Sequence, residues 1–496
     1  MSTTSIESLQ PRSVWNLFAG IAAVPRPSKQ EGKIRAHVRK LAESHGFAVR
    51  EDRVGNLLIE VPATKGHERV PITVLQGHLD MVCEKNAGTT HDFDKDPIRL
   101  VVDQLNGRAI VRADGTTLGA DNGIGVAMAF AAAIDPDCVH GPLEILCTID
   151  EEAGMTGAKA IEPSFFKGRR LLNLDSEEDD ALYIGCAGGT DTTLIWTLPT
   201  SAADGDVCRV SVSGLKGGHS GCDIHLNRGS AIACAVQTLA GAKEANLRLV
   251  TMSGGSKRNA IPREAAVVVA GPRGLVGRLT SAAAAVQQEA ISLGETGCKI
   301  TVESAAPAPA ASVVDTRRVL AALAALPHGV QAVVPEIAGL VQTSNGTTTV
   351  NCTTGGASGA GSSGGTLRVE VGCLSRSSSP TDMQALLRKI RAVADLAGAA
   401  AEQANDYPGW SPNAASPTLA VCRKAYERVF SHAPKIASIH AGLECGIIDG
   451  AVGHMDMVSF GPNIAGAHSP DERVEIDSVA KMYRYLVAVL GDLAKA

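Results

Sequence analysis

Apolar side chains recur at the spacing of one helix face over residues 34–41, so this stretch predicts an amphipathic helix. Ser28 and Glu31 have the spacing of a capping box at its start, and Gly46 is a typical stop at its end. Short apolar runs that end in polar clusters follow, and this pattern predicts strands. These runs cover residues 56–61, 71–76, 143–149 and 170–174.

Residues 123–134 form the longest run of low polarity and predict a buried helix. The run is far shorter than the ~20 residues that a membrane-spanning helix needs. With this helix, the first third of the chain alternates helix and strand, which is typical of an α/β sheet domain.

The pattern changes after Gly185. Residues 207–212 alternate polar and apolar side chains and predict a strand, and the Ala-rich residues 229–244 predict a helix. The Gly/Ser/Thr-rich residues 353–365 predict a surface loop, and residues 305–312 form an Ala/Pro stretch. Helix and strand patterns then return, at residues 419–430 and 453–460 respectively.

A chain of 496 residues exceeds what one hydrophobic core usually supports, so two domains are expected. Because the α/β pattern stops and later returns, we expect one domain to be inserted into the other. The α/β domain then consists of residues 1–186 and 402–496, and the inserted α+β domain of residues 187–401.

Composition excludes several classes of function. Hydrophobic residues at 45% and charged residues at 20% are typical of a globular protein. The net charge of -6 comes without long basic runs, so we expect no binding to nucleic acid or membranes. Residues 1–12 lack the features of a signal peptide, and no CxxC pair occurs among the twelve cysteines, so we expect a cytoplasmic protein with reduced thiols.

His78 and Asp80 end a predicted strand, two residues apart and hence on one face. Imidazole suits zinc, and a carboxylate on its other ring nitrogen would fix the tautomer. Asp121 lies in a Gly-bracketed turn just before the predicted buried helix, where it could bind a ligand or simply serve as an N-cap.

Asp150, Glu151 and Glu152 directly follow another predicted strand. Three adjacent carboxylates repel one another unless a cation is present, although a solvated acidic turn is the alternative. In extended backbone Glu151 and Glu152 would point in opposite directions, one to a metal and the other to a water molecule. Asp175 and His468 also follow predicted strands, where α/β sheets commonly carry functional residues.

These motifs resemble those of the M20 metallopeptidases and, within that family, of the bacterial aminoacyl-histidine dipeptidases. The resemblance spans almost the whole chain. Its blocks are residues 25–29, 77–86, 91–93, 96–98, 116–125, 150–157, 217–221, 440–446, 459–462 and 468–472.

The resemblance implies a zinc-peptidase-like α/β catalytic domain with an inserted lid or dimerisation domain. It also implies two zinc ions per chain, which cobalt or manganese could replace. Asp121 would bridge the two ions, with His78 and Asp175 on one ion and Glu152 and His468 on the other.

The resemblance further implies that Glu151 is the general base and that Asp80 orients His78. His219 would stabilise the oxyanion, in its own subunit or across a dimer. Asn259 and Arg376 would hold the C-terminal carboxylate of the substrate, and Arg suits such bidentate recognition. Two alternatives stay open: His219 could cap a strand in its Gly-rich turn, and Arg376 could form a surface salt bridge. Glu444 is expected to be buried, where it could support the metal ligands or have only a structural role.

The implied activity is hydrolysis of dipeptides, including Xaa-His dipeptides and β-alanyl-histidine, by a cytoplasmic homodimer. An aminoacylase-type amide hydrolase is one alternative, because the same metal centre can serve several acyl groups. A catalytically silent protein that binds metal or peptide is another. The presence of all five candidate ligands and of Glu151 argues against silence.

Overall fold

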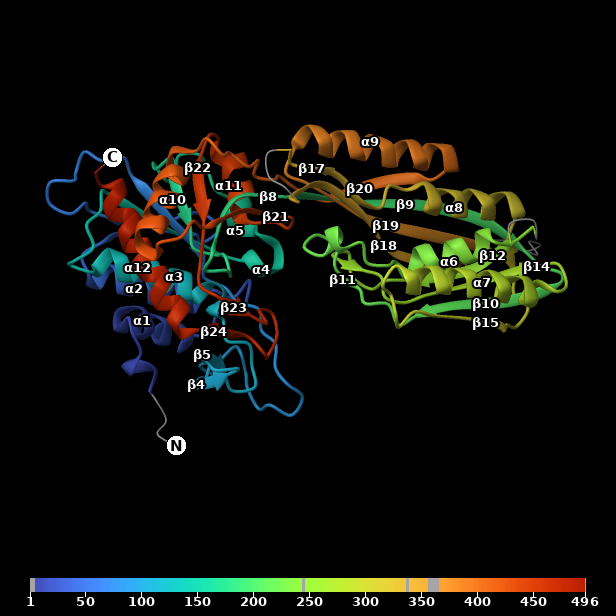
Figure 1. Cartoon of the computed structure of the whole chain (residues 1–496), viewed down its shortest axis with the longest axis horizontal. Coiled ribbons are helices and arrows are strands. Elements are labelled where there is room, and N and C mark those ends of the chain that lie inside the picture. Colours follow the sequence, from blue (N-terminus) through green and yellow to red (C-terminus); the bar gives the residue numbers. More distant parts are fainter. Residues whose placement is uncertain (1–4, 243–245, 336–338, 356–364, 496) are drawn as a thin grey trace. The chain divides into compact units, whose positions relative to one another are not determined.

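A computed structural model describes residues 5–242, 246–335, 339–355 and 365–495 of the chain (Figure 1). By its contacts the chain divides into two compact units. Unit 1 consists of Met1–Gly185, Trp410–Ser438 and Leu443–Ala496, and unit 2 of Cys186–Gly409 and Ile439–Gly442.

The second boundary differs from the expected one at residue 402. Strand β20 (Ala400–Tyr407) pairs with β9 (Gly188–Ser201) across this point, so its hydrogen bonds keep it in unit 2. Unit 2 therefore extends to Gly409, and residues 439–442 join it as well.

Unit 1 is built on an eight-stranded sheet with the order β1-β2-β6-β3-β7-β22-β8-β21. Its strands are β1 (Ala48–Glu51), β2 (Leu57–Val61), β3 (Thr73–His78), β6 (Leu143–Thr148), β7 (Arg170–Asn173), β8 (Ala181–Cys186), β21 (Lys435–Ile439) and β22 (Asp456–Ser459). The strands expected in the first third of the chain are all present. Strands β6, β3, β7 and β22 run parallel to one another, so their carboxyl ends lie along the same edge.

The helices of unit 1 include α3, which matches the predicted apolar run and is buried along nearly its whole length. Their bounds are α1 (Arg12–Ala22), α2 (Gly32–Ser44), α3 (Ala120–Ile134), α4 (Glu151–Gly154), α5 (Thr156–Lys159), α10 (Pro417–Phe430), α11 (Glu444–Val452) and α12 (Ile476–Leu493). A short 3-10 helix, Ile6–Ser8, precedes them.

The start of α2 differs from the prediction. The helix forms and stops before Gly46, which has φ 77°, but Ser28 and Glu31 make no capping box. The Ser28 hydroxyl donates instead to Asp80, and the Glu31 carboxylate accepts a hydrogen bond from the backbone N–H of Asp150. Both side chains are engaged by distant segments, so tertiary contacts override the local motif.

A β-hairpin that is not among the predicted elements lies between β3 and α3. Strands β4 (Leu100–Leu105) and β5 (Arg108–Ala113) pair antiparallel through the two-residue turn Asn106-Gly107. Both turn residues have positive φ, and Asn-Gly is the strongest short hairpin signal. The hairpin continues into a small sheet with β24 (Arg473–Glu475) and β23 (Ile464–Ala465).

Unit 2 contains a ten-stranded sheet in which the long strands β18, β19 and β9 lie side by side (Figure 1). Its strands are β9, β10 (Asp206–Ser213), β12 (Arg248–Gly254), β14 (Ala265–Gly271), β15 (Lys299–Ser304), β16 (Ala310–Ala311), β17 (Gly329–Val333), β18 (Val341–Gly355), β19 (Thr366–Ser377) and β20. Strands β11 (Gly218–His219) and β13 (Ala260–Ile261) pair with each other in a separate two-stranded sheet.

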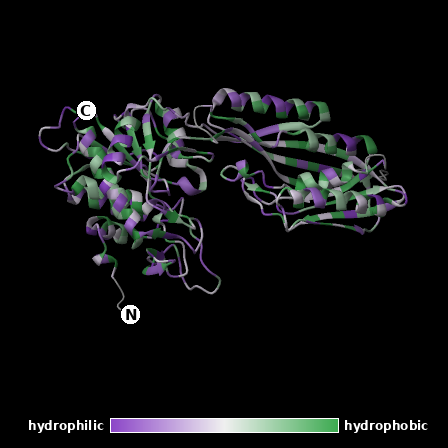
Figure 2. Ribbon diagram, in the orientation of Figure 1, coloured by the Kyte–Doolittle hydropathy of each residue, from purple (hydrophilic) through white to green (hydrophobic). Residues whose placement is uncertain are grey.

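Four helices of unit 2 share one hydrophobic core with this sheet. They are α6 (Ala231–Ala240), α7 (Leu275–Ser292), α8 (Val313–Ala325) and α9 (Pro380–Ala397), and a 3-10 turn lies at Ile224–Leu226. Hydrophilic and hydrophobic residues alternate along α9, as a helix with one buried face requires (Figure 2). The apolar residues of the sheet, such as Val267 and Val369, are fully buried against these helices.

Two low-complexity stretches have different outcomes. Ala310 and Ala311 in the Ala/Pro stretch are fully buried and pair with β9. Of the predicted loop at residues 353–365, residues 353–355 continue β18, which pairs there with β19. Residues 356–364 lie outside the described residues.

Candidate metal centre

The predicted ligands of unit 1 gather at the carboxyl edge of its parallel strands. His78 is the last residue of β3, Glu152 follows β6 through a turn, and Asp175 lies two residues beyond β7. Asp121 enters from the start of α3, and His468 from the loop between β23 and β24. The five residues come from separate stretches of the chain, as their position at strand ends predicted.

Asp121 lies between the two histidines. Its Oδ1 is 3.0 Å from Nε2 of His78, and its Oδ2 is 3.3 Å from Nε2 of His468. His78 also faces Asp175 at 3.4 Å, and His468 faces Glu152 at 3.0 Å. Two groups therefore share Asp121, and in each the potential ligand atoms lie within 4.8 Å of one another.

The chemistry of these groups fits a pair of divalent cations. Each offers one imidazole nitrogen and two carboxylates, which is a donor set that zinc accepts. Oε1 of Glu152 is buried without a hydrogen-bond partner in the described part of the chain. A buried carboxylate oxygen without a partner is costly, and a cation at this position would remove that cost.

Protonation in the metal-free chain reflects the crowding of charge. Hydrogen bonds to Asp121 and Glu152 raise the pKa of His468 to about 11. Burial raises the pKa of Asp175 to about 7 and that of Glu151 well above its usual range. Burial opposes ionisation of Asp121 too, but the hydrogen bonds to His468 and His78 hold its pKa below the usual range.

Asp80 contacts both His78 and the turn that contains Glu151 and Glu152. Its Oδ1 lies 3.4 Å from Nδ1 of His78 and accepts the backbone N–H of Glu151 at 3.0 Å. Its Oδ2 accepts the backbone N–H of Glu152 at 3.2 Å and the hydroxyl of Ser28 at 2.7 Å. Burial opposes ionisation of Asp80, but its bonds to His78 and to these donors lower its pKa to about 2.

Two local readings of the sequence are wrong. Asp121 is not the N-cap of α3, because Gly119 takes that position with φ 71°. Glu151 and Glu152 do not lie in extended backbone; they open the short helix α4. The side chain of Glu152 is only 5% exposed, which excludes a solvated acidic turn.

Residues that the sequence did not reveal hold the loop of Asp121. The Glu472 carboxylate accepts the backbone N–H groups of residues 118–121, at distances from 2.7 to 3.3 Å. The buried guanidinium of Arg26 donates to the carbonyls of Leu79, Asp80 and Gly119. Both residues stand inside recognisable motifs, but no local pattern indicates these partners.

Glu444 lies in a buried polar network beneath the same edge. Its Oε2 accepts hydrogen bonds from Gln76 and Thr148, both at 2.6 Å. Burial raises the pKa of Glu444 to about 7. Gln76 lies in β3, and Thr148 is the last residue of β6. The network therefore connects the start of α11 to strands that carry or precede candidate ligands.

In unit 2, the positive charge of Arg376 acts on the imidazole of His219. Nδ1 of His219 accepts the backbone N–H groups of Gly221 and Cys222, which leaves Nε2 as the protonated nitrogen. Burial, together with the charge of Arg376, lowers the pKa of His219 to about 4. Asn259 is exposed, and its backbone carbonyl accepts the N–H of Ser220.

Arg376 is buried, which excludes a surface salt bridge. It is 4% exposed and donates from Nη1 to the hydroxyl of Tyr407 at 3.0 Å. Among the described residues no carboxylate lies within salt-bridge distance of it, and its Nε has no hydrogen-bond partner there. A buried guanidinium with spare donors favours an anion from outside the chain.

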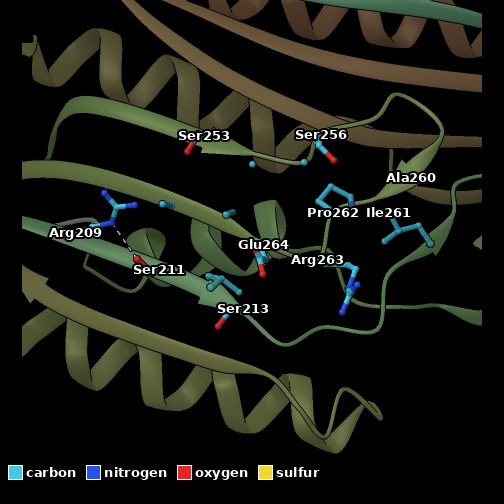
Figure 3. Close-up of a pocket in the computed structure, with 15 residues that line it drawn as sticks. Arg209, Ser211, Ser213, Ser253, Ser256, Ala260, Ile261, Pro262, Arg263 and Glu264 are labelled. Atoms are coloured by element: carbon cyan, nitrogen blue, oxygen red, sulfur yellow. Dashed lines mark hydrogen bonds between the residues drawn. The ribbon is translucent and has the colours of Figure 1, made fainter. Parts of the chain in front are cut away.

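Unit 2 also contains a pocket of about 740 Å³ over β10, β12 and β14. Figure 3 shows Arg209 and Ser211 at one end of it and Ile261 and Arg263 towards the other. Glu264 is the one acidic residue among the described residues that line it, which is too few for a cluster of metal ligands.

Comparison with known proteins places the chain in a family. Residues 74–492 match peptidase family M20/M25/M40. The chain belongs to this family. It is therefore an M20 peptidase and a hydrolase, and the resemblance seen in its motifs is confirmed. The α/β fold of M20 type is confirmed as well.

Relatives of this M20 peptidase include the cytosol non-specific dipeptidase of Escherichia coli (strain K12), which is 40% identical over 497 residues and matches over 99% of both proteins. The crystal structure of aminoacylhistidine dipeptidase from Vibrio alginolyticus shares 41% sequence identity, with a TM-score of 0.85 and 98% of both chains covered. Aminopeptidase PepT from Bacillus cereus ATCC 10987 shares the fold at 17% identity, with a TM-score of 0.56 over 98% of this chain and 99% of that one.

Within the described residues of this M20 peptidase, no helix is both long and apolar enough to span a lipid bilayer.

Proposed function

We propose that this chain is a dipeptidase that uses two divalent cations, zinc in the first place, and that Xaa-His dipeptides including β-alanyl-histidine are among its substrates. The position of Asp121 carries the proposal. One of its carboxylate oxygens faces His78 and the other faces His468, at 3.0 and 3.3 Å. A carboxylate between two imidazoles suits a pair of ions that act together on one substrate.

The two groups of side chains divide the ions between them. His78, Asp121 and Asp175 would hold one ion, and Asp121, Glu152 and His468 the other. Nitrogen and carboxylate donors also suit cobalt and manganese, so either metal could replace zinc. When bound, the cations would lower the pKa of a water molecule and polarise the scissile carbonyl.

Glu151 is the proposed general base. It is placed by the same turn that presents Glu152, and the two lie in one cluster with His78. The Glu151 carboxylate would accept a proton from the attacking water and return it to the departing amine. Asp80 would hold His78 and the backbone of this turn in place.

The substrate-binding residues proposed in unit 2 are His219, Asn259 and Arg376. Arg376 would bind the C-terminal carboxylate of the dipeptide, because the chain provides no anion for its buried guanidinium among the described residues. Nε2–H of His219 would donate to the oxyanion. The side-chain amide N–H of Asn259 would donate a hydrogen bond to the same substrate.

The names of two relatives support the proposed substrate specificity and cellular location. A protein 40% identical to this chain is called a cytosol non-specific dipeptidase, and one 41% identical is called an aminoacylhistidine dipeptidase. These names support a cytoplasmic dipeptidase and leave the strictness of the histidine preference to experiment. A homodimer formed through unit 2 is part of the proposal.

A substrate panel with defined metal content tests the proposal. The purified chain is stripped of metal and then reloaded with zinc, manganese or cobalt. Hydrolysis of alanyl-histidine, β-alanyl-histidine, alanyl-alanine and N-acetyl-histidine is measured at one enzyme concentration. We expect metal-dependent cleavage of the dipeptides and no cleavage of the N-acetyl compound.

Other outcomes would replace the proposal. Preference for N-acetyl-histidine would indicate an aminoacylase-type hydrolase. A chain that binds two ions per molecule and cleaves nothing would indicate a silent binding protein. Sedimentation equilibrium of the same preparation tests the proposed homodimer.

A further inference from the structure

The turn that presents Glu151 depends on a residue in an unfavourable backbone conformation. Asp150 has φ 52° and ψ 40°, in the left-handed region, where a residue other than glycine is uncommon. This conformation turns the chain from β6 directly into α4, whose first residue is Glu151. Such a conformation persists only where the surrounding contacts enforce it.

Three consecutive backbone N–H groups of the turn donate to two buried carboxylates. The N–H of Asp150 donates to Oε1 of Glu31 at 3.0 Å. The next two, from Glu151 and Glu152, donate to Oδ1 and Oδ2 of Asp80 at 3.0 and 3.2 Å. Glu31 thus continues a row of acceptors that Asp80 begins.

A local hydrogen bond and burial also fix the side chain of Glu31. Its Oε1 also accepts the backbone N–H of Lys29 at 2.7 Å, and the residue is only 3% exposed. Ser28, three residues earlier, donates its hydroxyl to Oδ2 of Asp80. One short segment before α2 therefore contacts both carboxylates that hold the turn.

We propose that Glu31 is a positioning residue for Glu151, acting through the backbone of Asp150; this inference rests on the proposed function of Glu151 as general base. Without Glu31 the buried N–H of Asp150 loses its acceptor, and the left-handed turn loses one of the contacts that enforce it. Glu151 then shifts relative to the metal ligands. A displacement of about 1 Å can cost about 100-fold in rate.

The same carboxylates could instead form a third cation site, since ligand atoms of Glu31, Asp80 and Asp150 lie within 4.8 Å of one another. Their hydrogen bonds favour the positioning role. Oε1 of Glu31 and both oxygens of Asp80 already accept N–H or O–H groups, whereas only Oδ1 of Asp150 is buried without a partner among the described residues.

The test compares three variants of Glu31 with a matched control. E31A removes the acceptor, E31D withdraws it by one methylene, and E31Q keeps a carbonyl oxygen that can accept both N–H groups but removes the charge. The control is E144A. Glu144 is equally buried at 3% and also accepts backbone N–H groups, from Lys167 and Gly168, but it lies near the opposite end of β6.

For the zinc-loaded chain we expect kcat to fall about 100-fold in E31A and E31D, with KM changed by less than about threefold. E31Q and E144A should retain wild-type kcat. Metal analysis should give two ions per chain in every variant. Equal loss in E31Q, or full activity in E31D, would overturn the proposal, as would a third ion in the wild type that E31A removes.

Amide hydrogen exchange gives a readout that does not depend on activity. In the metal-free chain we expect the amides of residues 150–152 to exchange at least about tenfold faster in E31A and E31D than in the wild type. E144A should leave them unchanged and accelerate residues 167–168. If the wild type cleaves no dipeptide, the proposed function fails, while the exchange data still decide whether Glu31 holds this turn.

Discussion

Oε1 of Glu472 lies 3.3 Å from the backbone nitrogen of Asp121, across 351 residues of sequence. The same carboxylate accepts the N–H groups of Leu118, Gly119 and Ala120. Glu472 follows His468 by four residues. One loop thus contributes a candidate ligand, His468, and also fixes the backbone of Asp121, the candidate ligand that the two groups share.

Replacing Glu472 by alanine should weaken both folding and metal binding. Several buried N–H groups lose their acceptor, and buried Arg26 loses a nearby opposite charge. We expect a loss of about 3–5 kcal/mol in the free energy of unfolding and about 10- to 100-fold weaker zinc binding. Urea unfolding and competition with a chelator measure the two effects. D471A, at the exposed neighbouring position, should match the wild type; equal zinc affinity in E472A would contradict the assigned role.

The sequence could predict most of the candidate ligands because they follow strands of recognisable pattern. His78, Asp175 and the acidic turn at Glu152 all come directly after apolar runs, and parallel strands bring such ends together. Asp121 was found by its position between glycines and the start of an apolar helix. These signals are local, so they can be recognised in a single sequence.

The supporting residues could not be predicted because their partners are distant. Ser28 and Glu31 have the spacing of a capping box, yet they bind Asp80 and Asp150, 52 and 119 residues away. Glu472 stands inside the block at residues 468–472, but no local pattern indicates its partners at residues 118–121. The hairpin at Asn106-Gly107 is different, because its Asn-Gly turn is a local signal that the sequence does carry.

Replacing Glu151 should separate catalysis from metal binding. The residue lies beside the ligands but is not needed to complete either group around Asp121. We expect E151A to bind two ions and to lose about 100- to 10,000-fold in kcat for alanyl-histidine. Atomic absorption and steady-state kinetics provide the two numbers. E178A, in an exposed position of the acidic stretch after Asp175, serves as control, and near-normal turnover by E151A would refute its role as base.

His440 should make unit 2 less stable in mild acid. Burial, together with the charge of Arg376, lowers its pKa to about 3. The unfolded chain binds a proton at this residue below pH ~6.5, whereas the folded chain does not, so stability is intact above that pH and is lost as the pH falls towards the folded pKa. The loss is roughly 1.4 kcal/mol per pH unit for one histidine.

The variant H440N isolates this contribution. Asparagine does not titrate, but its shorter side chain does not reach the position of Nε2, which lies 2.7 Å from the Ser344 hydroxyl, so the comparison rests on the pH dependence and not on absolute stability. Urea unfolding of the metal-free chain at pH 7, 6 and 5 should show a smaller loss of stability in H440N than in the wild type. Parallel curves for the two proteins would mean that His440 is not a buried neutral histidine.

Arg376 should determine whether the substrate needs a free carboxylate. We expect the wild type to prefer alanyl-histidine over alanyl-histidine amide, and R376A to lose this preference. The kcat/KM for the free acid should fall about 100-fold or more in R376A, because a charge pair of roughly 3 kcal/mol is lost. R209A removes an exposed arginine of the same unit (Figure 3) and should leave both substrates unaffected. Undiminished discrimination in R376A would exclude carboxylate recognition by this residue.

Gly125 sets how closely α3 approaches the end of β7. A Cβ at this position would lie 2.2 Å from the backbone carbonyl of Leu174, the residue before Asp175. G125A should therefore push the start of α3, with Asp121, away from Asp175. Because these two carboxylates belong to one candidate metal group, we expect about 10- to 100-fold weaker zinc binding and a loss of about 1–3 kcal/mol in the free energy of unfolding.

Gly20 in α1 provides the matched control. A Cβ there would meet only the ring of His37, at 3.6 Å, which is ordinary contact. G20A should keep the zinc affinity of the wild type and gain about 0.4–1 kcal/mol in stability, since alanine restricts the unfolded chain more than glycine does. Zinc titration and urea unfolding of both variants make the comparison. Wild-type zinc affinity in G125A would show that the spacing between α3 and β7 does not control the metal centre.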